Sequence, residues 1–193
     1  MILLVSVVTM QPLFSEKSKK NMAVKSLLNW LDPIRLDERE KFLKKSVTHL
    51  IGASPSNLTL YRLAFLHASA SKESVAENYK ESNERLEFLG DSVLGMITAT
   101  YLFQKFPFKD EGFLTEIRSR MVSRESLNVI GRKLGLEEVI EFEAQRKTSM
   151  ARTSMYGDAL EAFIGAVYLD KGFAFTQNFI IKKILTQYFD LEA

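Results

Sequence analysis

Residues 83–106 read NERLEFLGDSVLGMITATYLFQKF, and this stretch decides how the rest of the chain is arranged. It contains no proline and is long enough for a buried helix of several turns. At about 100° per residue, Glu84, Glu87 and Asp91 fall within about 60° of one another on one face. The opposite face is apolar and consists of Leu86, Leu89, Val93 and Ile97. Because carboxylates repel one another and are costly to bury alone, this grouping predicts a cation among them.

A second segment, YGDALEAFIGAVYLD over residues 156–170, repeats this pattern. Asp158 and Glu161 are three residues apart and therefore share one face of a helix. Ala162 and Gly165 lie beside them, and their small size would let another helix or a ligand approach closely. Two helices that each carry acids on one stripe predict a shared cation site between them.

Composition limits what kind of cation that site can hold. The chain has 193 residues, no cysteine and two histidines, which excludes disulfides and zinc–thiolate sites. The site would therefore bind its cation through oxygen, which suits Mg²⁺, with Mn²⁺ able to substitute. The formal charge of +2 neither requires nor excludes a polyanionic partner. We identify no apolar run long enough to span a bilayer, so no membrane partner is expected.

Helical spacing recurs along most of the chain and predicts an all-α fold. Helices are expected over residues 37–51, 58–67, 83–106, 113–122, 126–134, 156–170 and 173–189. Residues 68–82 are expected to run over the surface with a short helix near 75–79, and residues 137–155 to form an irregular basic loop. Residues 1–36 are expected to be an N-terminal extension, flexible in part, and residues 37–193 a single catalytic domain.

The sequence ERLEFLGDSVL over residues 84–94 resembles the signature of the ribonuclease III family. The order of the other motifs agrees with that resemblance: LHASAS precedes the signature, FPFKDEG follows one helix later, and YGDALEAFIGAVYLD comes at the distance of the family's second acidic motif. The resemblance covers roughly residues 37–191. A long signature with a second motif in register is more specific than a single short pattern.

The resemblance implies an all-α, homodimeric, Mg²⁺-dependent endonuclease that cuts double-stranded RNA by a two-metal mechanism. It also implies a cytoplasmic role in processing ribosomal and messenger RNA. By position, the acids that match the family's metal-binding and catalytic residues are Glu87, Asp91, Asp158 and Glu161, and we expect Asp91 and Glu161 to carry catalysis. Glu84 and Glu111 match acids at the edge of the cleavage site. Phe88 matches an aromatic residue of the dimer interface.

One departure from the family leaves two alternatives open. The family usually appends a double-stranded-RNA-binding domain, and we expect none in this chain, so it is either truncated or a stand-alone nuclease domain. The alternative function is a non-catalytic RNA-binding or ribosome-associated module of the same fold. The four acids argue against that alternative, because a binding role has no need of them.

Overall fold

The structure is a computed structural model that describes residues 38–71, 74–76, 79–143 and 149–190. The chain divides into two units, Met1–Phe42 and Leu43–Ala193. The expected extension over residues 1–36 lies outside the described residues. In the first unit, residues 38–42 are helical.

The described part of the second unit is built almost entirely from helices, which confirms the all-α fold. Residues 43–51 are helical and are followed by Gly52 in a left-handed conformation. The remaining elements are, in chain order, α2 (Leu58–Ala64), the 3₁₀ turn η1 (Ala68–Ala70), β1 (Ser74–Ala76), β2 (Tyr79–Lys80), α3 (Glu84–Lys105), α4 (Glu111–Met121), α5 (Arg124–Lys133), the 3₁₀ turn η2 (Leu136–Glu138), α6 (Ser149–Phe179), the π-helical segment η3 (Ile180–Leu185) and α7 (Thr186–Tyr188).

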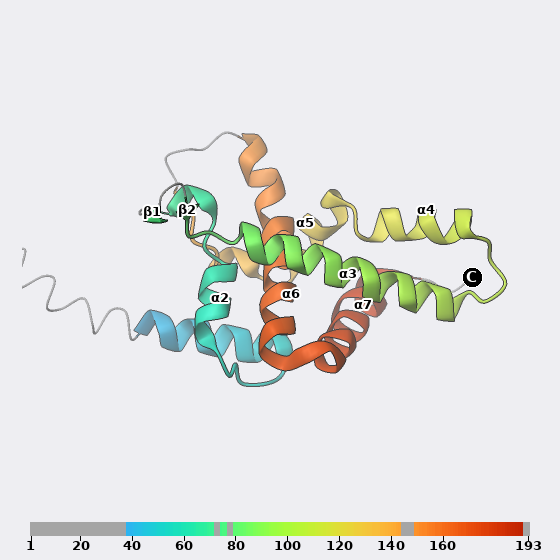
Figure 1. The fold of residues 1–193 in the computed structure, drawn as a ribbon, viewed down its shortest axis with the longest axis horizontal. Helices are drawn as coiled ribbons and strands as arrows, with labels where there is room; N and C mark the ends of the chain where they lie inside the picture. The colour runs from blue at the N-terminus through green and yellow to red at the C-terminus, as the bar shows by residue number, and fades with distance from the viewer. Residues whose placement is uncertain (1–37, 72–73, 77–78, 144–148, 191–193) are drawn as a thin grey trace, which may run out of the picture. The chain divides into compact units, whose positions relative to one another are not determined.

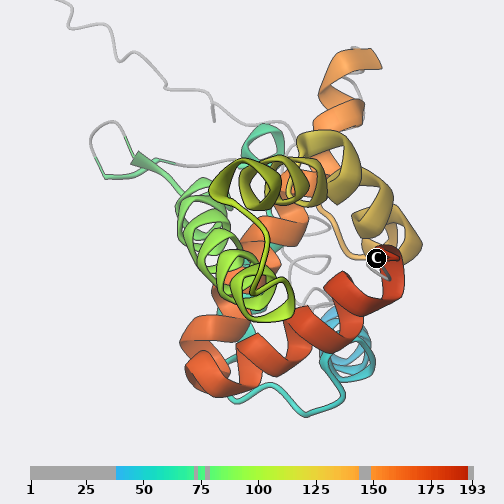
Figure 2. The ribbon, with the colours of Figure 1, turned by 90° about the vertical axis from the view of Figure 1, so that its right-hand side faces the viewer.

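Helix α6 is the centre of this arrangement and packs against α2, α3 and α5. Figure 1 shows α3 crossing α6, and Figure 2 gives the perpendicular view. The two backbones approach closely at two glycines. A Cβ atom added at Gly90 would overlap the Glu161 carbonyl, and one added at Gly165 would overlap the Leu86 carbonyl. The crossing therefore requires both glycines, and it occurs at the residues that carry the acids.

The apolar composition of α3 is explained by its place in the core. By length and composition α3 could span a membrane, contrary to the expectation that no segment could. Its inner face, however, is buried against the rest of the fold through Val93, Leu94, Ile97 and Leu102. The core thus accounts for the apolar residues of this inner face.

Side-chain caps start two helices earlier than their apolar spacing predicts. Helix α4 begins at Glu111 rather than at residue 113, because an Asp110 side-chain oxygen accepts the backbone N–H of Phe113 at 2.9 Å. Helix α5 begins at Arg124 rather than at residue 126, because the Ser123 hydroxyl accepts the N–H of Ser126 at 3.2 Å. Such caps satisfy N–H groups that the helix itself leaves without partners.

Two loop predictions were wrong in part. Instead of a short helix near residues 75–79, β1 and β2 pair as an antiparallel hairpin, with Ser74 opposite Lys80. A helix of about five residues is too short to stabilise itself, since nucleation is costly. The expected irregular loop over residues 137–155 also ends early, because α6 begins at Ser149.

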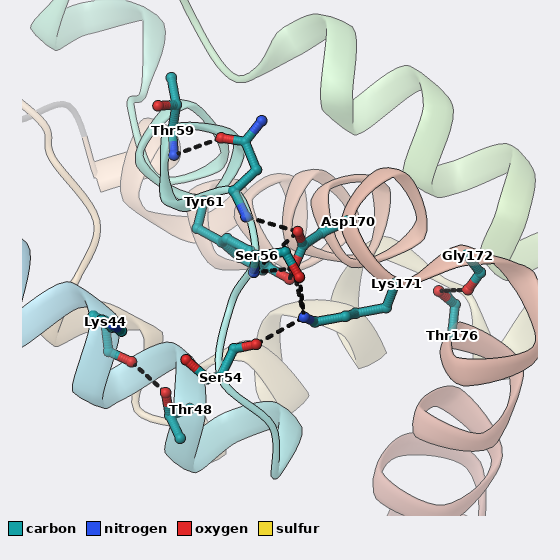
Figure 3. Close-up of polar contacts among 11 residues, drawn as sticks. Lys44, Thr48, Ser54, Ser56, Thr59, Tyr61, Asp170, Lys171, Gly172 and Thr176 are labelled. Carbon is teal, nitrogen blue, oxygen red and sulfur yellow. Dashed lines mark hydrogen bonds and ion pairs between the residues drawn. The ribbon is translucent and has the colours of Figure 1, made fainter.

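A polar cluster at the far end of α6 attaches the segment before α2 (Figure 3). The Asp170 carboxylate accepts the backbone N–H groups of Ser56 and Asn57, at 3.0 and 2.8 Å, and the Tyr61 hydroxyl at 2.9 Å. Lys171 Nζ lies 3.3 Å from the same carboxylate. Although burial favours its neutral form, these donors hold the pKa of Asp170 below its ordinary value. Beyond this cluster Gly172 breaks α6 with a φ of 77°, which separates the two helices expected there.

Candidate metal centre

A cleft of about 700 Å³ lies beside the crossing of α3 and α6. Its walls come from α3, α5, α6 and the one residue Val122, which lies between α4 and α5. The lining residues are Glu84, Glu87, Phe88, Asp91, Val122, Arg124, Leu127, Gly157, Asp158 and Glu161. Acids that are about 70 residues apart in the sequence therefore share one cleft.

Three of these carboxylates are close enough to bind one ion together. One oxygen atom from each of Glu87, Asp158 and Glu161 lies within 4.8 Å of the other two, and all three residues are partly buried. Asp91 lines the same cleft but is exposed and lies outside this close group. The arrangement thus consists of three partly buried carboxylates with a fourth at the open side.

The electrostatics of the cleft disfavour this arrangement in the absence of a cation. Burial, followed by the charges of Asp91, Glu87 and Asp158, raises the pKa of Glu161 to about 8. Burial and the neighbouring carboxylates of Asp158 and Glu84 also raise the pKa of Glu87. The Arg124 charge opposes both shifts. Carboxylates near one another resist joint ionisation unless positive charge is added.

The hydrogen bonding of the cleft also indicates that its carboxylates need a cation. Among the residues that the structure describes, none donates a hydrogen bond to the side chains of Glu87, Asp91, Asp158 or Glu161, and none forms an ion pair with them. Partly buried carboxylates without partners are unfavourable. An all-oxygen donor set with water access matches what Mg²⁺ and Mn²⁺ prefer, so the residues fit such an ion.

The other predicted site residues have different positions. Glu84 lines the cleft at the first turn of α3 and accepts the Ser82 hydroxyl at 3.0 Å. Phe88 lines it too, and its side chain is 78% exposed. Glu111 is not among the lining residues of this single chain: it is the first residue of α4, and its carboxylate accepts the Thr115 hydroxyl at 2.7 Å.

Two residues of the cleft region, Arg124 and Asn128, are not predicted from the sequence. Arg124 is the only cation among the described residues that line the cleft. Asn128 is buried and connects α5 to α6: its amide nitrogen donates to the Arg124 carbonyl at 2.8 Å, and its oxygen accepts the Gly157 N–H at 2.9 Å. No sequence signal separates these two residues from the other polar residues of a short, polar helix.

Comparison with known proteins relates the chain to one family. A family model described as ribonuclease-III-like matches residues 57–188. Ribonuclease 3 of Azobacteroides pseudotrichonymphae is 39% identical over 168 residues, which are 87% of this chain and 62% of that protein. Ribonuclease 3 of Bacteroides thetaiotaomicron is also 39% identical, over 86% of this chain and 53% of that protein. The chain thus spans between half and two thirds of the length of these relatives.

Solved structures agree with the sequence relatives. The nuclease domain of ribonuclease III from Campylobacter jejuni matches with a TM-score of 0.67 and 31% identity, over 77% of this chain and 97% of that domain. A second structure of the Campylobacter jejuni domain matches with a TM-score of 0.66 and 31% identity, over 74% of this chain and 96% of that domain. Its description reports structural flexibility in a region of that domain that is involved in dimer formation.

Proposed function

Since the chain belongs to the ribonuclease III family, we propose that it is an endoribonuclease that hydrolyses phosphodiester bonds of double-stranded RNA. The observation that carries this proposal is the set of four carboxylates, without partners among the described residues, that α3 and α6 bring into one cleft. A-form RNA is recognised mainly through its shape, phosphates and 2′-hydroxyls, which an acidic cleft with bound cations suits.

We assign the metal site to Glu87, Asp158 and Glu161, with Asp91 as the further ligand at its open side. The proposed cofactor is Mg²⁺, and two such ions would supply an activated water and positive charge beside the leaving oxygen. The protein's part is to hold four carboxylates deprotonated in one place and to admit the RNA strand. Of these four, we propose that Asp91 and Glu161 would hold the ion that activates the water. Glu84, which lines the cleft at the first turn of α3, is proposed to lie at the edge of the substrate site. Glu111, which lies outside the cleft of one chain, is proposed for the same role.

We further propose that the active form is a homodimer. Phe88, Met96 and Phe103 project from α3 within about 80° of one another, and their side chains are 78%, 50% and 71% exposed. Exposed apolar side chains aligned on one helix are a common mark of an interface. A two-fold axis would bury the same patch on both copies and give one acidic cleft to each RNA strand.

The wider role follows the family. We propose that residues 37–193 form the catalytic domain and that the protein acts in ribosomal and messenger RNA processing in the cytoplasm. The absence of cysteine is compatible with a reducing compartment. The alternative, a non-catalytic RNA-binding module, is disfavoured because such a module gains nothing from four carboxylates that repel one another.

The test is cleavage of end-labelled duplex RNA by the wild type, with Mg²⁺ and with a chelator. We expect cleavage only with Mg²⁺, and we expect Glu161→Gln to lower the rate by at least about a thousandfold, which corresponds to about 4 kcal/mol of barrier. Glu125→Gln is the matched control, because Glu125 is exposed on α5 and does not line the cleft.

Circular dichroism should show both variants folded. If Glu161→Gln retains near-normal activity at saturating Mg²⁺, the assignment of Glu161 as a metal ligand is wrong. If the wild type binds duplex RNA but never cuts it, the non-catalytic alternative holds.

A further inference from the structure

Arg124 occupies an unfavourable place for a helix but a useful one for the cleft. It is the first residue of α5 and is exposed. The amino end of a helix carries partial positive charge, so a cation there is disfavoured. Ser123 already caps this helix end with its hydroxyl. Helix stability therefore gives no reason for an arginine at this position.

The backbone of Arg124 is held firmly against the segment that carries the acids. The buried Asn128 side chain uses its amide nitrogen on the Arg124 carbonyl and its oxygen on the N–H of Gly157. Gly157 directly precedes Asp158 and packs closely, since an added Cβ would lie 3.4 Å from the Leu127 Cβ. This one amide therefore fixes the start of α5 relative to Asp158.

Among the described residues, the Arg124 guanidinium does not bind the carboxylates of the cleft. Its charge acts on Glu87 and Glu161 across the cleft. Within the described residues, however, it forms no hydrogen bond and no ion pair with any carboxylate. Its five N–H donors remain available, and a planar guanidinium can give two parallel hydrogen bonds to one phosphate.

From this placement we propose that Arg124 binds a non-bridging phosphate oxygen of the RNA strand in the cleft and thereby positions that strand beside the carboxylates of α3 and α6. The proposal rests on the proposed function. Arg124 is a substrate-binding residue in this account, because it touches the phosphate backbone. Its contact is independent of base identity, as a backbone contact must be.

The experiment measures duplex RNA binding in a Glu161→Gln background, which prevents cleavage, at fixed saturating Mg²⁺. Arg124→Gln should weaken binding by roughly tenfold or more, as for the loss of a charged hydrogen bond. It should also reduce the slope of log affinity against log salt by about one. Arg124→Lys keeps the positive charge but loses the two parallel hydrogen bonds of the planar guanidinium. We therefore expect it to keep the salt dependence of the parent and only part of its affinity.

Arg120→Gln is the matched control, because Arg120 is an exposed arginine on α4 that lies 3.9 Å from Glu116 and does not line the cleft. It should change the affinity by less than about threefold, as expected for an exposed charge. Equal losses in Arg120→Gln and Arg124→Gln would overturn the proposal, since they would mean a general charge effect.

A second readout separates phosphate binding from simple neutralisation of the acids. Binding of Mg²⁺ to the folded protein should raise its melting temperature. If Arg124 only offsets the charge of the acids, Arg124→Gln should change this rise and leave the RNA affinity unchanged. That result would overturn the proposal. A wild type that still cuts duplex RNA in that case keeps the proposed function intact. Failure of the Glu161→Gln parent to bind duplex RNA, with no cleavage by the wild type, would overturn both.

Discussion

At the scale of single residues, the acids of the cleft are destabilising until a cation joins them. Glu161 is the clearest case, because burial and three neighbouring carboxylates raise its pKa from 4.5 to about 8. In the unfolded chain the same group would titrate near its ordinary value. Protonation and metal binding are therefore two alternative ways of relieving the same repulsion.

This difference predicts how stability depends on pH without metal. Between about pH 4.5 and pH 8 the folded state binds more protons than the unfolded state, so the free energy of unfolding falls as the pH rises. The stabilising contribution is complete below about pH 4.5 and is lost as the pH rises through about 8. We expect the melting temperature in a chelator to fall by several degrees between pH 5 and pH 8.

Two controls accompany that measurement. Glu161→Gln should flatten most of the dependence, whereas Glu125→Gln should keep it. Millimolar Mg²⁺ should raise the melting temperature most at the higher pH, because ligands must be deprotonated to bind an ion that the unfolded chain does not bind. A metal-free wild type whose melting temperature rises over this range would contradict the account.

At the scale of elements, the site depends on how closely α3 and α6 approach. Gly90 and Gly165 each face a backbone carbonyl of the opposite helix, so neither position has room for a side chain. Glu87 lies three residues before Gly90, Asp91 directly follows it, and Glu161 supplies the carbonyl that Gly90 faces. The close crossing and the grouping of the acids are therefore one structural feature.

Gly90→Ala should accordingly separate the two helices. We expect a loss of about 3 kcal/mol or more of stability, at the upper end for overpacking, together with weaker Mg²⁺ binding. Gly112→Ala is the control, since an added Cβ there meets only the Asp110 carboxylate at 3.5 Å. It should leave the melting temperature unchanged or slightly higher, because alanine favours a helix. Equal melting temperatures for the two variants would refute the crossing as described.

The other end of α6 offers a second test at this scale. Asp170→Asn should destabilise the fold by about 2–4 kcal/mol, because it replaces a buried acceptor of three hydrogen bonds and places an amide against donors. Lys171→Met removes the hydrogen bonds that Lys171 Nζ donates to the Ser54 carbonyl and the Ser56 hydroxyl, each at 2.7 Å. It should nevertheless cost less, since Asp170 keeps its three donors and those two acceptors are not charged. Chemical denaturation measures the free energy of unfolding of both variants. A larger loss for Lys171→Met than for Asp170→Asn would contradict this prediction.

At the scale of the whole molecule, the exposed face of α3 predicts assembly. Phe88 lies beside charged groups with most of its surface in water, an unfavourable setting for a side chain whose burial stabilises by about 1.5–3 kcal/mol. A second copy that covers the patch of Phe88, Met96 and Phe103 would remove that surface from water. Interfaces of this kind use the same residues on both copies.

We therefore predict a homodimer at micromolar concentration and a shift of Phe88→Ala toward monomer. Because two rings leave the interface, the dissociation constant should rise by at least about a hundredfold, with loss of double-strand cutting. Phe173→Ala is the control: Phe173 is also exposed but lies beyond the Gly172 break in α6. Light scattering that finds a monomeric wild type, while it still cuts both strands, would defeat this prediction.

The helical class, the two acidic stripes and the small residues beside them follow from the amino-acid sequence alone, because helical periodicity is local and extends over only a few turns. Apolar spacing does not predict the first residues of α4 and α5, because the side chains of Asp110 and Ser123 cap those helices and determine where they begin. Packing in three dimensions places Glu87, Asp158 and Glu161 within reach of one ion, and it leaves Glu111 outside the cleft of the same chain. The tertiary structure also revealed Arg124 and Asn128. The distance between residues far apart in the sequence depends on how closely two helices pack. Here the contacts of Gly90 and Gly165 with carbonyls of the opposite helix set that distance.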